Sequence, residues 1–260
     1  MGLVVSQVRK AGAGAPSISY SWGPRQPAIR AVITYPRYGI TLTMPKTRHA
    51  TPTMIYRIVH KSCLRTLMSR GALYAPNMTP DDGLLYRTIH NVSVQTNRHL
   101  KQIPCGPGGT AHDYVPFYFG PLSVMLLNLK TGRVQGYDEG QQPLVYLVSS
   151  VQAVAKDGYQ FVFSDGHGLA GFTQWYDDLK DLKAVDWDIV AERYWHDKPQ
   201  DNDRQRRKQA EFLVRDHVEW DLISEIAVYN DAVKDQVIAL LRNFPDLSQP
   251  PVVVRRDWYY

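Results

Sequence analysis

The chain of 260 residues has little cysteine and no long apolar run, and these shortages exclude several protein classes. Its two cysteines, Cys63 and Cys105, lie far apart and form no C-x-x-C pair. That spacing argues against a zinc site built from thiolates and favours a reducing compartment, so we expect no metal. No stretch approaches the roughly eighteen uninterrupted apolar residues that a membrane span requires, so we also expect no membrane association.

Acidic side chains are missing from the first fifth of the chain. Residues 1–50 hold seven of the 30 Lys and Arg residues and no Asp or Glu, which leaves 23 basic and 25 acidic side chains beyond residue 50. This first segment is rich in Gly, Pro and Ser and shows no sustained period, so we expect a basic, poorly ordered extension. A transit peptide, an arm that touches nucleic-acid phosphates, and a mistaken start before Met44 or Met54 all fit it.

Residues 51–260 are long enough for one domain with a full hydrophobic core. Their composition predicts strands over 53–60, 112–129, 143–150, 160–167, 224–229 and 252–260, with another that begins near Glu211. Apolar spacing predicts helices over 62–71 and 185–195, and a third that places Val233, Val237, Leu240 and Leu241 on one face. Short strands with few helices favour an α+β domain, and the lack of a G-x-G-x-x-G motif argues against a Rossmann site.

Three clusters could carry chemistry. The first is the polar stretch 91–98, which precedes the glycine-rich PCGPGG (104–109) within a long segment, 75–113, that shows little periodicity. The second is the aromatic run HDYVPFYF (112–119), and the third joins the basic stretch 203–214 with SDGH (164–167). Long irregular segments in a compact domain are usually functional or mobile.

Each cluster also has a purely structural interpretation. Aromatic crowding is most often core packing, and Glu211 could be an exposed acid paired loosely with Arg204, Arg206, Arg207 and Lys208, a contribution of ~0–1 kcal/mol. The functional alternative is a carboxylate at the rim of a pocket, with cations nearby for a phosphorylated or nucleic-acid substrate. Aromatic rings beside basic loops are also the ingredients of a groove for single-stranded nucleic acid.

Six motifs resemble the landmarks of the DarT family in the same order: YRIVH, PCGPGG, HDYVPFYF, FVFSDGH, RRKQAEFLV and RRDWYY. The resemblance covers about residues 54–260. DarT proteins are bacterial toxins that transfer ADP-ribose from NAD onto a base of single-stranded DNA, typically thymine, and a macrodomain partner, DarG, reverses the modification. The resemblance therefore implies an ADP-ribosyltransferase-like α+β fold over 51–260, with central split antiparallel sheets flanked by helices. It also implies NAD as co-substrate, no metal, a DarG-like antitoxin and the bacterial cytoplasm.

The resemblance also assigns residues. Glu211 and Arg98 match the catalytic glutamate and arginine, and Arg98 is grouped with His60 and Tyr114 for NAD binding. The residues assigned to the DNA substrate are His167, Met125, Arg204, Arg206 and Arg207. Some relatives read His-Ile-Thr-His where this chain has Arg57-Ile58-Val59-His60, so no contact from residue 57 or 59 is carried over.

The family chemistry suits these residue types. Cleavage between nicotinamide and ribose develops oxocarbenium character, which a carboxylate stabilises, and the attacking thymine nitrogen must also lose a proton. Three alternatives remain open at this point. They are the same transfer to guanine or RNA, a non-catalytic module that binds single-stranded nucleic acid, and an NAD glycohydrolase.

Overall fold

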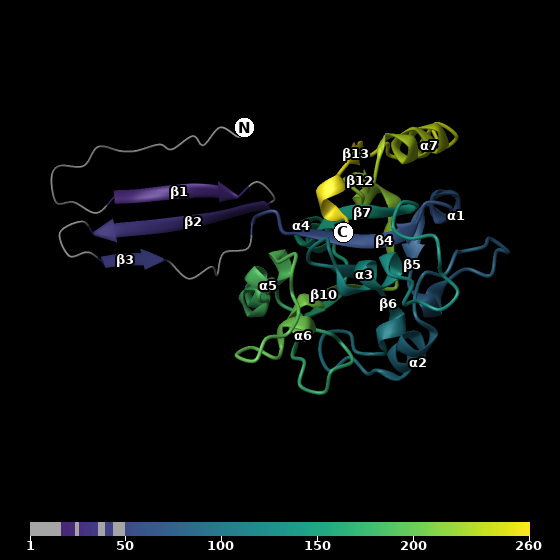
Figure 1. The fold of residues 1–260 in the computed structure, drawn as a ribbon. Coiled ribbons are helices and arrows are strands. Elements are labelled where there is room, and N and C mark those ends of the chain that lie inside the picture. The colour runs from purple at the N-terminus through teal and green to yellow at the C-terminus, as the bar shows by residue number, and fades with distance from the viewer. Residues whose placement is uncertain (1–16, 24–25, 36–39, 44–49) are drawn as a thin grey trace. The chain divides into compact units, whose positions relative to one another are not determined.

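The computed structural model describes residues 17–23, 26–35, 40–43 and 50–260, and the chain divides into two units, Met1–Thr51 and Pro52–Tyr260. In the first unit, β1 (Ser17–Gly23), β2 (Gln26–Tyr35) and β3 (Ile40–Thr43) form an antiparallel sheet (Figure 1). These three strands were not predicted from the sequence. The rest of the predicted basic extension lies outside the described residues.

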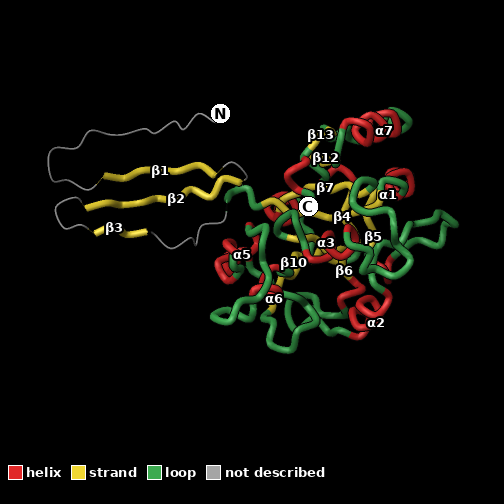
Figure 2. Tube along the Cα trace, viewed as in Figure 1, coloured by secondary structure: helices red, strands yellow, loops and turns green. Residues whose placement is uncertain are grey.

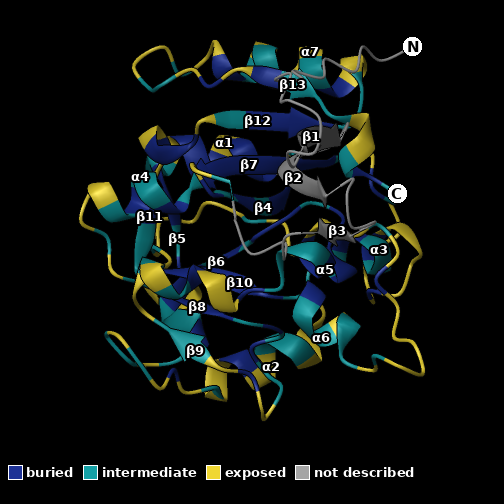
Figure 3. Ribbon diagram, turned by 90° about the vertical axis from the view of Figure 1, so that its left-hand side faces the viewer, coloured by how far each residue is buried: buried dark blue, intermediate teal, exposed yellow. Residues whose placement is uncertain are grey.

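An eight-stranded sheet forms the centre of the second unit. Its strands are β4 (Met54–His60), β6 (Tyr114–Tyr118), β7 (Leu144–Ser150), β8 (Phe161–Ser164), β9 (Trp175–Tyr176), β10 (Glu211–Arg215), β12 (Glu225–Val228) and β13 (Val252–Val254). Figure 3 shows them in the order β13-β12-β7-β4-β6-β10-β8-β9, from top to bottom and largely buried. Neighbouring strands are antiparallel except β12 and β13, and β5 (Ala72–Tyr74) pairs separately with β11 (His217–Glu219).

The two halves of this sheet are joined at one point. β4 pairs with β7 at seven positions from Met54 to His60, but with β6 at Tyr56 and Tyr118 alone. Backbone pairing between β4 and β6 is therefore limited to this one position. The predicted α+β fold with split antiparallel sheets flanked by helices is confirmed.

Helices cover the sheet (Figure 2). The α-helices are α1 (Cys63–Arg70), α2 (Val92–Leu100), α3 (Val124–Lys130), α4 (Val151–Lys156), α5 (Trp187–Ala191), α6 (Arg204–Lys208) and α7 (Asp231–Leu241). Short 3₁₀ turns span Pro76–Met78, Ala111–Asp113, Leu179–Ala184, Trp220–Leu222 and Arg256–Trp258. The predicted helix over 62–71 is confirmed, since α1 ends at Gly71, which adopts φ +67° and donates its N–H to the Met68 carbonyl.

Side chains that alternate along the strands pack into two apolar layers, one on each face of the sheet. In β4, Ile55 and Val59 join the layer that includes α1, whereas Tyr56 and Ile58 join the layer that includes α3. Successive side chains of a strand point to opposite faces, so one strand supplies both layers. None of the helices in the described ranges combines the length and apolar content that a bilayer crossing requires.

Two sequence predictions are wrong in instructive ways. The run 112–129 contains a strand and a helix, because β6 ends at Tyr118 and the Ser123 hydroxyl caps α3 by accepting from the Leu126 N–H. The segment 75–113 contains α2, whose Asn91 side chain caps the helix by accepting from the Ser93 N–H. Arg98 is the buried residue of α2, so this helix has no apolar stripe that periodicity could reveal.

The end of the chain enters the core instead of forming one long strand. β13 stops at Val254, and the 3₁₀ turn Arg256–Trp258 lets Tyr259 become fully buried. The Tyr259 hydroxyl lies 3.0 Å from the Leu144 carbonyl oxygen and 3.2 Å from that of Ala227, so it joins β7 to β12.

We expect Tyr259→Phe to lower the free energy of unfolding by about 1–2 kcal/mol, because buried carbonyl groups would lose their hydroxyl donor while the ring stays packed. Urea denaturation would measure the change. Tyr194→Phe, at a tyrosine that is 74% exposed, is the matched control and should unfold like the original protein. Equal midpoints for all three proteins would show that the buried hydroxyl contributes nothing.

Candidate active site

A buried ion pair joins α2 to the first residue of β10. The Glu211 carboxylate accepts hydrogen bonds at 3.0 and 2.9 Å from Nη1 of Arg98, which lies 113 residues away in the chain. The two side chains are 7% and 11% exposed, respectively. The purely structural interpretation of Glu211, an exposed acid paired with its basic neighbours, is therefore wrong.

The surroundings of Glu211 fix its position. Its backbone N–H donates to the Ser164 hydroxyl at 3.3 Å, and the β10 register places Glu211 opposite Tyr118 of β6. Gly168 lies against the carboxylate so closely that a Cβ atom there would stand 2.4 Å from Glu211 Oε1. Glycine at position 168 is thus required for the loop after β8 to cover the carboxylate.

A cavity of about 420 Å³ opens beside this ion pair. Both halves of the split sheet line it, together with α2 and α3. Five residues assigned by the family resemblance lie on its wall: Arg98, Tyr114, Met125, His167 and Glu211. No group of His, Cys, Asp or Glu within residues 50–260 is arranged to hold a metal ion.

His167 is held next to the carboxylate by its backbone. Its N–H donates to the Arg206 carbonyl at 2.9 Å, and its own carbonyl accepts from the Thr173 hydroxyl at 2.8 Å. Burial lowers the pKa of His167, although the charge of Glu211 acts in the opposite direction. The ring is therefore neutral at pH 7 and can both donate and accept a hydrogen bond.

Tyr114 and Met125 form less polar parts of the wall. The Tyr114 hydroxyl donates to the Gly108 carbonyl at 2.5 Å, so the glycine-rich loop is tied to β6. Met125 receives a contact of 3.4 Å from the Tyr118 hydroxyl to its sulfur. Burial, reinforced by the charge of Glu211, raises the pKa of Tyr118 to about 12, so this hydroxyl stays protonated.

The structure does not bring His60 to the cavity. Its Nδ1 lies 2.7 Å from the Ser62 hydroxyl, and its Nε2 lies 3.4 Å from a carboxylate oxygen of Glu139. The β4 residues that line the cavity are Arg57 and Ile58. NAD binding by His60 stays a prediction. Arg57, and not His60, lies on the cavity wall.

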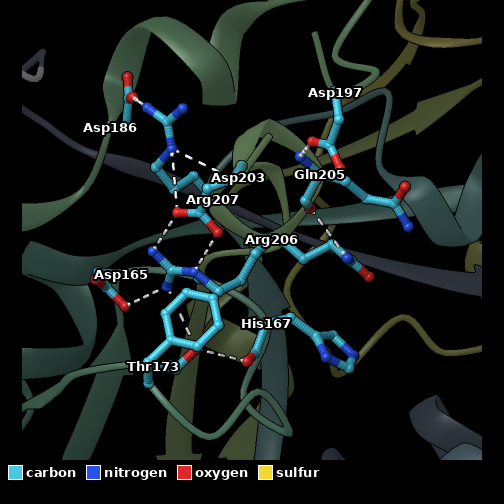
Figure 4. A network of polar contacts seen from close by, with 12 residues as sticks. Asp165, His167, Thr173, Asp186, Asp197, Asp203, Gln205, Arg206 and Arg207 are labelled. Carbon is cyan, nitrogen blue, oxygen red and sulfur yellow. Dashed lines mark hydrogen bonds and ion pairs between the residues drawn. The ribbon is translucent and has the colours of Figure 1, made fainter. Parts of the chain in front are cut away.

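Arg206, expected at the DNA substrate, is engaged within the protein (Figure 4). Its guanidinium forms two hydrogen bonds of 2.8 Å to Asp203 and another of 2.8 Å to Asp165. A Cβ atom on Gly166 would stand 2.3 Å from Arg206 Nη1, so a glycine leaves room for this arrangement. The guanidinium thus ties α6 to the loop after β8.

The other cations of this stretch have internal partners as well. Arg207 pairs with Asp186 and Asp201, and Arg204 donates to two backbone carbonyl groups, those of Tyr194 and His196. Their assignment to DNA phosphates stays a prediction that these contacts do not favour. The sequence could not reveal the pairs with Asp165 and Asp186, because both residues lie outside the basic stretch 203–214.

Several polar residues of the cavity wall were not singled out in the sequence. They include Asn128 and Gln209, whereas Arg57, which also lines the cavity, had been considered and given no contact. Asn128 lies one helical turn after Met125 in α3, so the spacing would have identified it had the helix been predicted.

The ion pair predicts strong coupling in a double-mutant cycle. Glu211→Gln alone leaves the Arg98 charge unpaired and should lower the free energy of unfolding by about 1–3 kcal/mol, less than for a sealed pair because the cavity admits water. Combining it with Arg98→Gln should cost less than the sum of the single changes. Urea denaturation of the four proteins measures the coupling.

The Arg255–Glu225 pair, with side chains 41% and 19% exposed, provides the control cycle. Its coupling should lie within about 0–1 kcal/mol. Strictly additive effects of Arg98→Gln and Glu211→Gln would contradict a stabilising buried pair.

Lys208 predicts a pH dependence of stability. Its Nζ donates to the Val190 and Glu192 carbonyl groups at 2.7 Å, and burial lowers its pKa to about 7. The unfolded chain keeps this proton up to about pH 10.4, so stability rises with pH from about 7 to 10 and falls as pH decreases toward 7. The slope approaches about 1.4 kcal/mol per pH unit.

Lys208→Met should remove this contribution, as measured by unfolding free energies at several pH values across the window. Lys198→Met, at an exposed residue of the same region, should leave the original slope unchanged. Parallel stability curves for the original protein and Lys208→Met would refute the lowered pKa.

The comparisons with known proteins agree with this geometry. The family model described as "ssDNA thymidine ADP-ribosyltransferase, DarT" matches residues 56–260. A protein of Thermus sp. (strain 2.9) named DNA ADP-ribosyl transferase is 41% identical over 215 residues, which covers 83% of this chain and 100% of that protein.

Solved structures of Thermus sp. 2.9 DarT are also similar. The complex with ADP-ribosylated ssDNA has a TM-score of 0.77 and 40% identity, and covers 82% of this chain and 98% of that one. The complex with NAD+ has a TM-score of 0.74 and 40% identity, with coverage of 82% and 100%. This chain therefore belongs to the DarT family.

Proposed function

We propose that this chain transfers ADP-ribose from NAD onto a thymine base of single-stranded DNA. The observation that carries the proposal is the buried Arg98–Glu211 pair on the wall of a cavity of about 420 Å³. A related Thermus protein with 40% identity has been solved with NAD+ and with ADP-ribosylated ssDNA, which supports both substrates.

Arg98 is suited to hold NAD while it remains near Glu211. Its Nη1 contacts both carboxylate oxygens, whereas Nη2 is buried and has no hydrogen-bond partner among the described residues. A buried donor without an acceptor is unfavourable, so an anionic or polar group of NAD would satisfy it. The buried ring of Tyr114 then supplies an apolar wall, since its hydroxyl is already bonded to Gly108.

Glu211 acts on the reacting ribose. As the bond from ribose C1′ to nicotinamide breaks, nicotinamide leaves with the bonding electron pair and positive charge develops on the ribose. The fixed carboxylate of Glu211 stabilises this charge without having to reorganise, because Ser164 and Gly168 hold the start of β10 and its side chain in place.

The second half of the reaction requires a base. A ring nitrogen of thymine attacks C1′ with its lone pair, and the proton that it loses passes to the Glu211 carboxylate. The products are the ADP-ribosylated base and nicotinamide, and the proton on Glu211 returns to solvent. Neutral His167, next to Glu211 on the cavity wall, can hydrogen-bond the incoming base.

One incubation discriminates this proposal from its rivals. Labelled NAD is supplied with thymine-rich DNA, guanine-rich DNA or RNA oligonucleotides, and label transfer and free ADP-ribose are followed by mass spectrometry. Label on guanine or RNA would show that the acceptor is not thymine. Release of ADP-ribose alone would indicate a glycohydrolase, and no NAD turnover would indicate a binding module.

Family membership also supports a biological setting. We propose that the chain is a toxin of the bacterial cytoplasm that a DarG-like macrodomain protein counteracts. Co-expression tests this directly, because growth arrest by this chain should be relieved by such a partner.

Glu211→Gln should lower transfer to a thymine-containing oligonucleotide by roughly 10²–10³-fold, because the shape remains while the negative charge is lost. Loss of the base role would add to this effect. Exposed Glu219→Gln is the control and should transfer normally. Near-normal transfer by folded Glu211→Gln would refute the catalytic assignment.

Residues from Pro52 onward should suffice for the activity. A shortened chain that begins at Pro52 keeps the Thr53 N–H bond to Gln152 and the whole of β4. It should transfer ADP-ribose normally. It should bind DNA more weakly at low salt, because it lacks the seven Lys and Arg residues of the first segment, and contacts between such cations and phosphates are strongest when little salt screens them. A folded but inactive shortened chain would show that residues 1–51 are part of the enzyme.

A further inference from the structure

One aromatic ring near the cavity is exposed to solvent. Phe172, in the loop between β8 and β9, is 64% exposed. A single exposed apolar side chain needs no functional explanation. Phe172 differs because its support is fixed and because its loop forms part of the cavity wall.

The support is the guanidinium of Arg206. Its central carbon lies 4.8 Å from the centroid of the Phe172 ring. The bonds of this guanidinium to Asp203 and Asp165 fix its position, and Thr173 Oγ1 lies 3.3 Å from its Nη1 (Figure 4). An aromatic ring held in advance against a fixed plane loses little freedom when a ligand stacks on it.

The loop also reaches the reacting groups. The His167 carbonyl accepts from the Ala170 N–H at 3.0 Å and from the Thr173 hydroxyl at 2.8 Å, so the loop that carries Phe172 closes back on His167. His167 lines the cavity, and Gly168 packs on the Glu211 carboxylate. A nucleotide adjoining a base that sits in the cavity would therefore meet this loop.

We propose that Phe172, supported by Arg206, is the stacking platform for a nucleobase next to the target base of single-stranded DNA, an inference that rests on the proposed function. Each base has a flat π-face, so stacking on an aromatic ring tolerates any sequence. The carboxylates of Asp165 and Asp203 already neutralise Arg206, which favours a stacking role over phosphate binding. The related Thermus protein solved with ADP-ribosylated ssDNA makes a DNA strand the fitting occupant.

Binding measured without NAD separates this inference from the transfer reaction. The probe is a short labelled DNA strand with one central thymine, used intact and with each neighbouring base in turn replaced by an abasic site. The proteins are the original chain, Phe172→Ala, Phe172→Trp and, as a control, Tyr194→Ala at an aromatic residue that is 74% exposed. Fluorescence anisotropy gives the dissociation constants, and the KM for NAD is measured separately.

We expect Phe172→Ala to weaken binding of the intact strand by roughly 5- to 100-fold, and Phe172→Trp and Tyr194→Ala to bind like the original protein. Replacing one particular neighbouring base by an abasic site should weaken binding by the original protein as much as Phe172→Ala does. The same abasic strand should bind Phe172→Ala no more weakly than the intact strand does. The KM for NAD should not change.

Normal binding of the intact strand by Phe172→Ala would overturn the platform. The platform would also be overturned if each abasic site weakened binding by Phe172→Ala as much as it weakens binding by the original protein. If the surface around Phe172 instead binds a protein partner, Phe172→Ala should bind the DNA strand normally, and the platform is again overturned. If the original protein binds as expected but transfers no ADP-ribose, the proposed function fails while the platform stands.

Discussion

The burial of one arginine–glutamate pair constrains this molecule more than any other contact described for residues 50–260. Taking two charges out of water costs several kcal/mol per ion, so each must keep its partner. Arg98 is also the buried residue of α2, and the rest of that helix is partly or fully exposed. The position of α2 on the domain therefore depends on the same guanidinium that is proposed to hold NAD, which links substrate binding to the placement of this helix.

The single junction between the halves of the sheet explains where that pair can lie. Strands β4 and β6 meet at Tyr56 and Tyr118, and Glu211 lies opposite Tyr118 in the register of β6 with β10. The carboxylate thus stands next to this junction, on the wall of a cavity that both halves of the sheet line. A fully paired sheet would fill this space with backbone hydrogen bonds and leave no room for two substrates.

Local sequence patterns predicted the parts of the fold that bury apolar side chains. The strand over 53–60 and the helix over 62–71 carry clear apolar patterns and are confirmed as β4 and α1. Helix α2 was missed because its buried residue is an arginine, and α3 because a short apolar run does not distinguish a helix from a strand. A charge partner 113 residues away lies beyond any local pattern, so the resemblance to a family, and not spacing, brought Arg98 and Glu211 together.

The cations of the basic stretch 203–214 have partners within the protein, which affects how this region can attract DNA. Beyond residue 50 the chain has 23 basic and 25 acidic side chains, and the cations closest to Glu211 in sequence are bound to carboxylates or carbonyl groups. Phosphate binding depends on cations that can release counterions from DNA, and paired arginines release few. Around Glu211, binding of a single strand should therefore depend more on ring stacking and on the shape of the cavity than on these cations. The seven Lys and Arg residues of the segment 1–50, which has no Asp or Glu, are then the part of the sequence most able to make DNA binding depend steeply on salt.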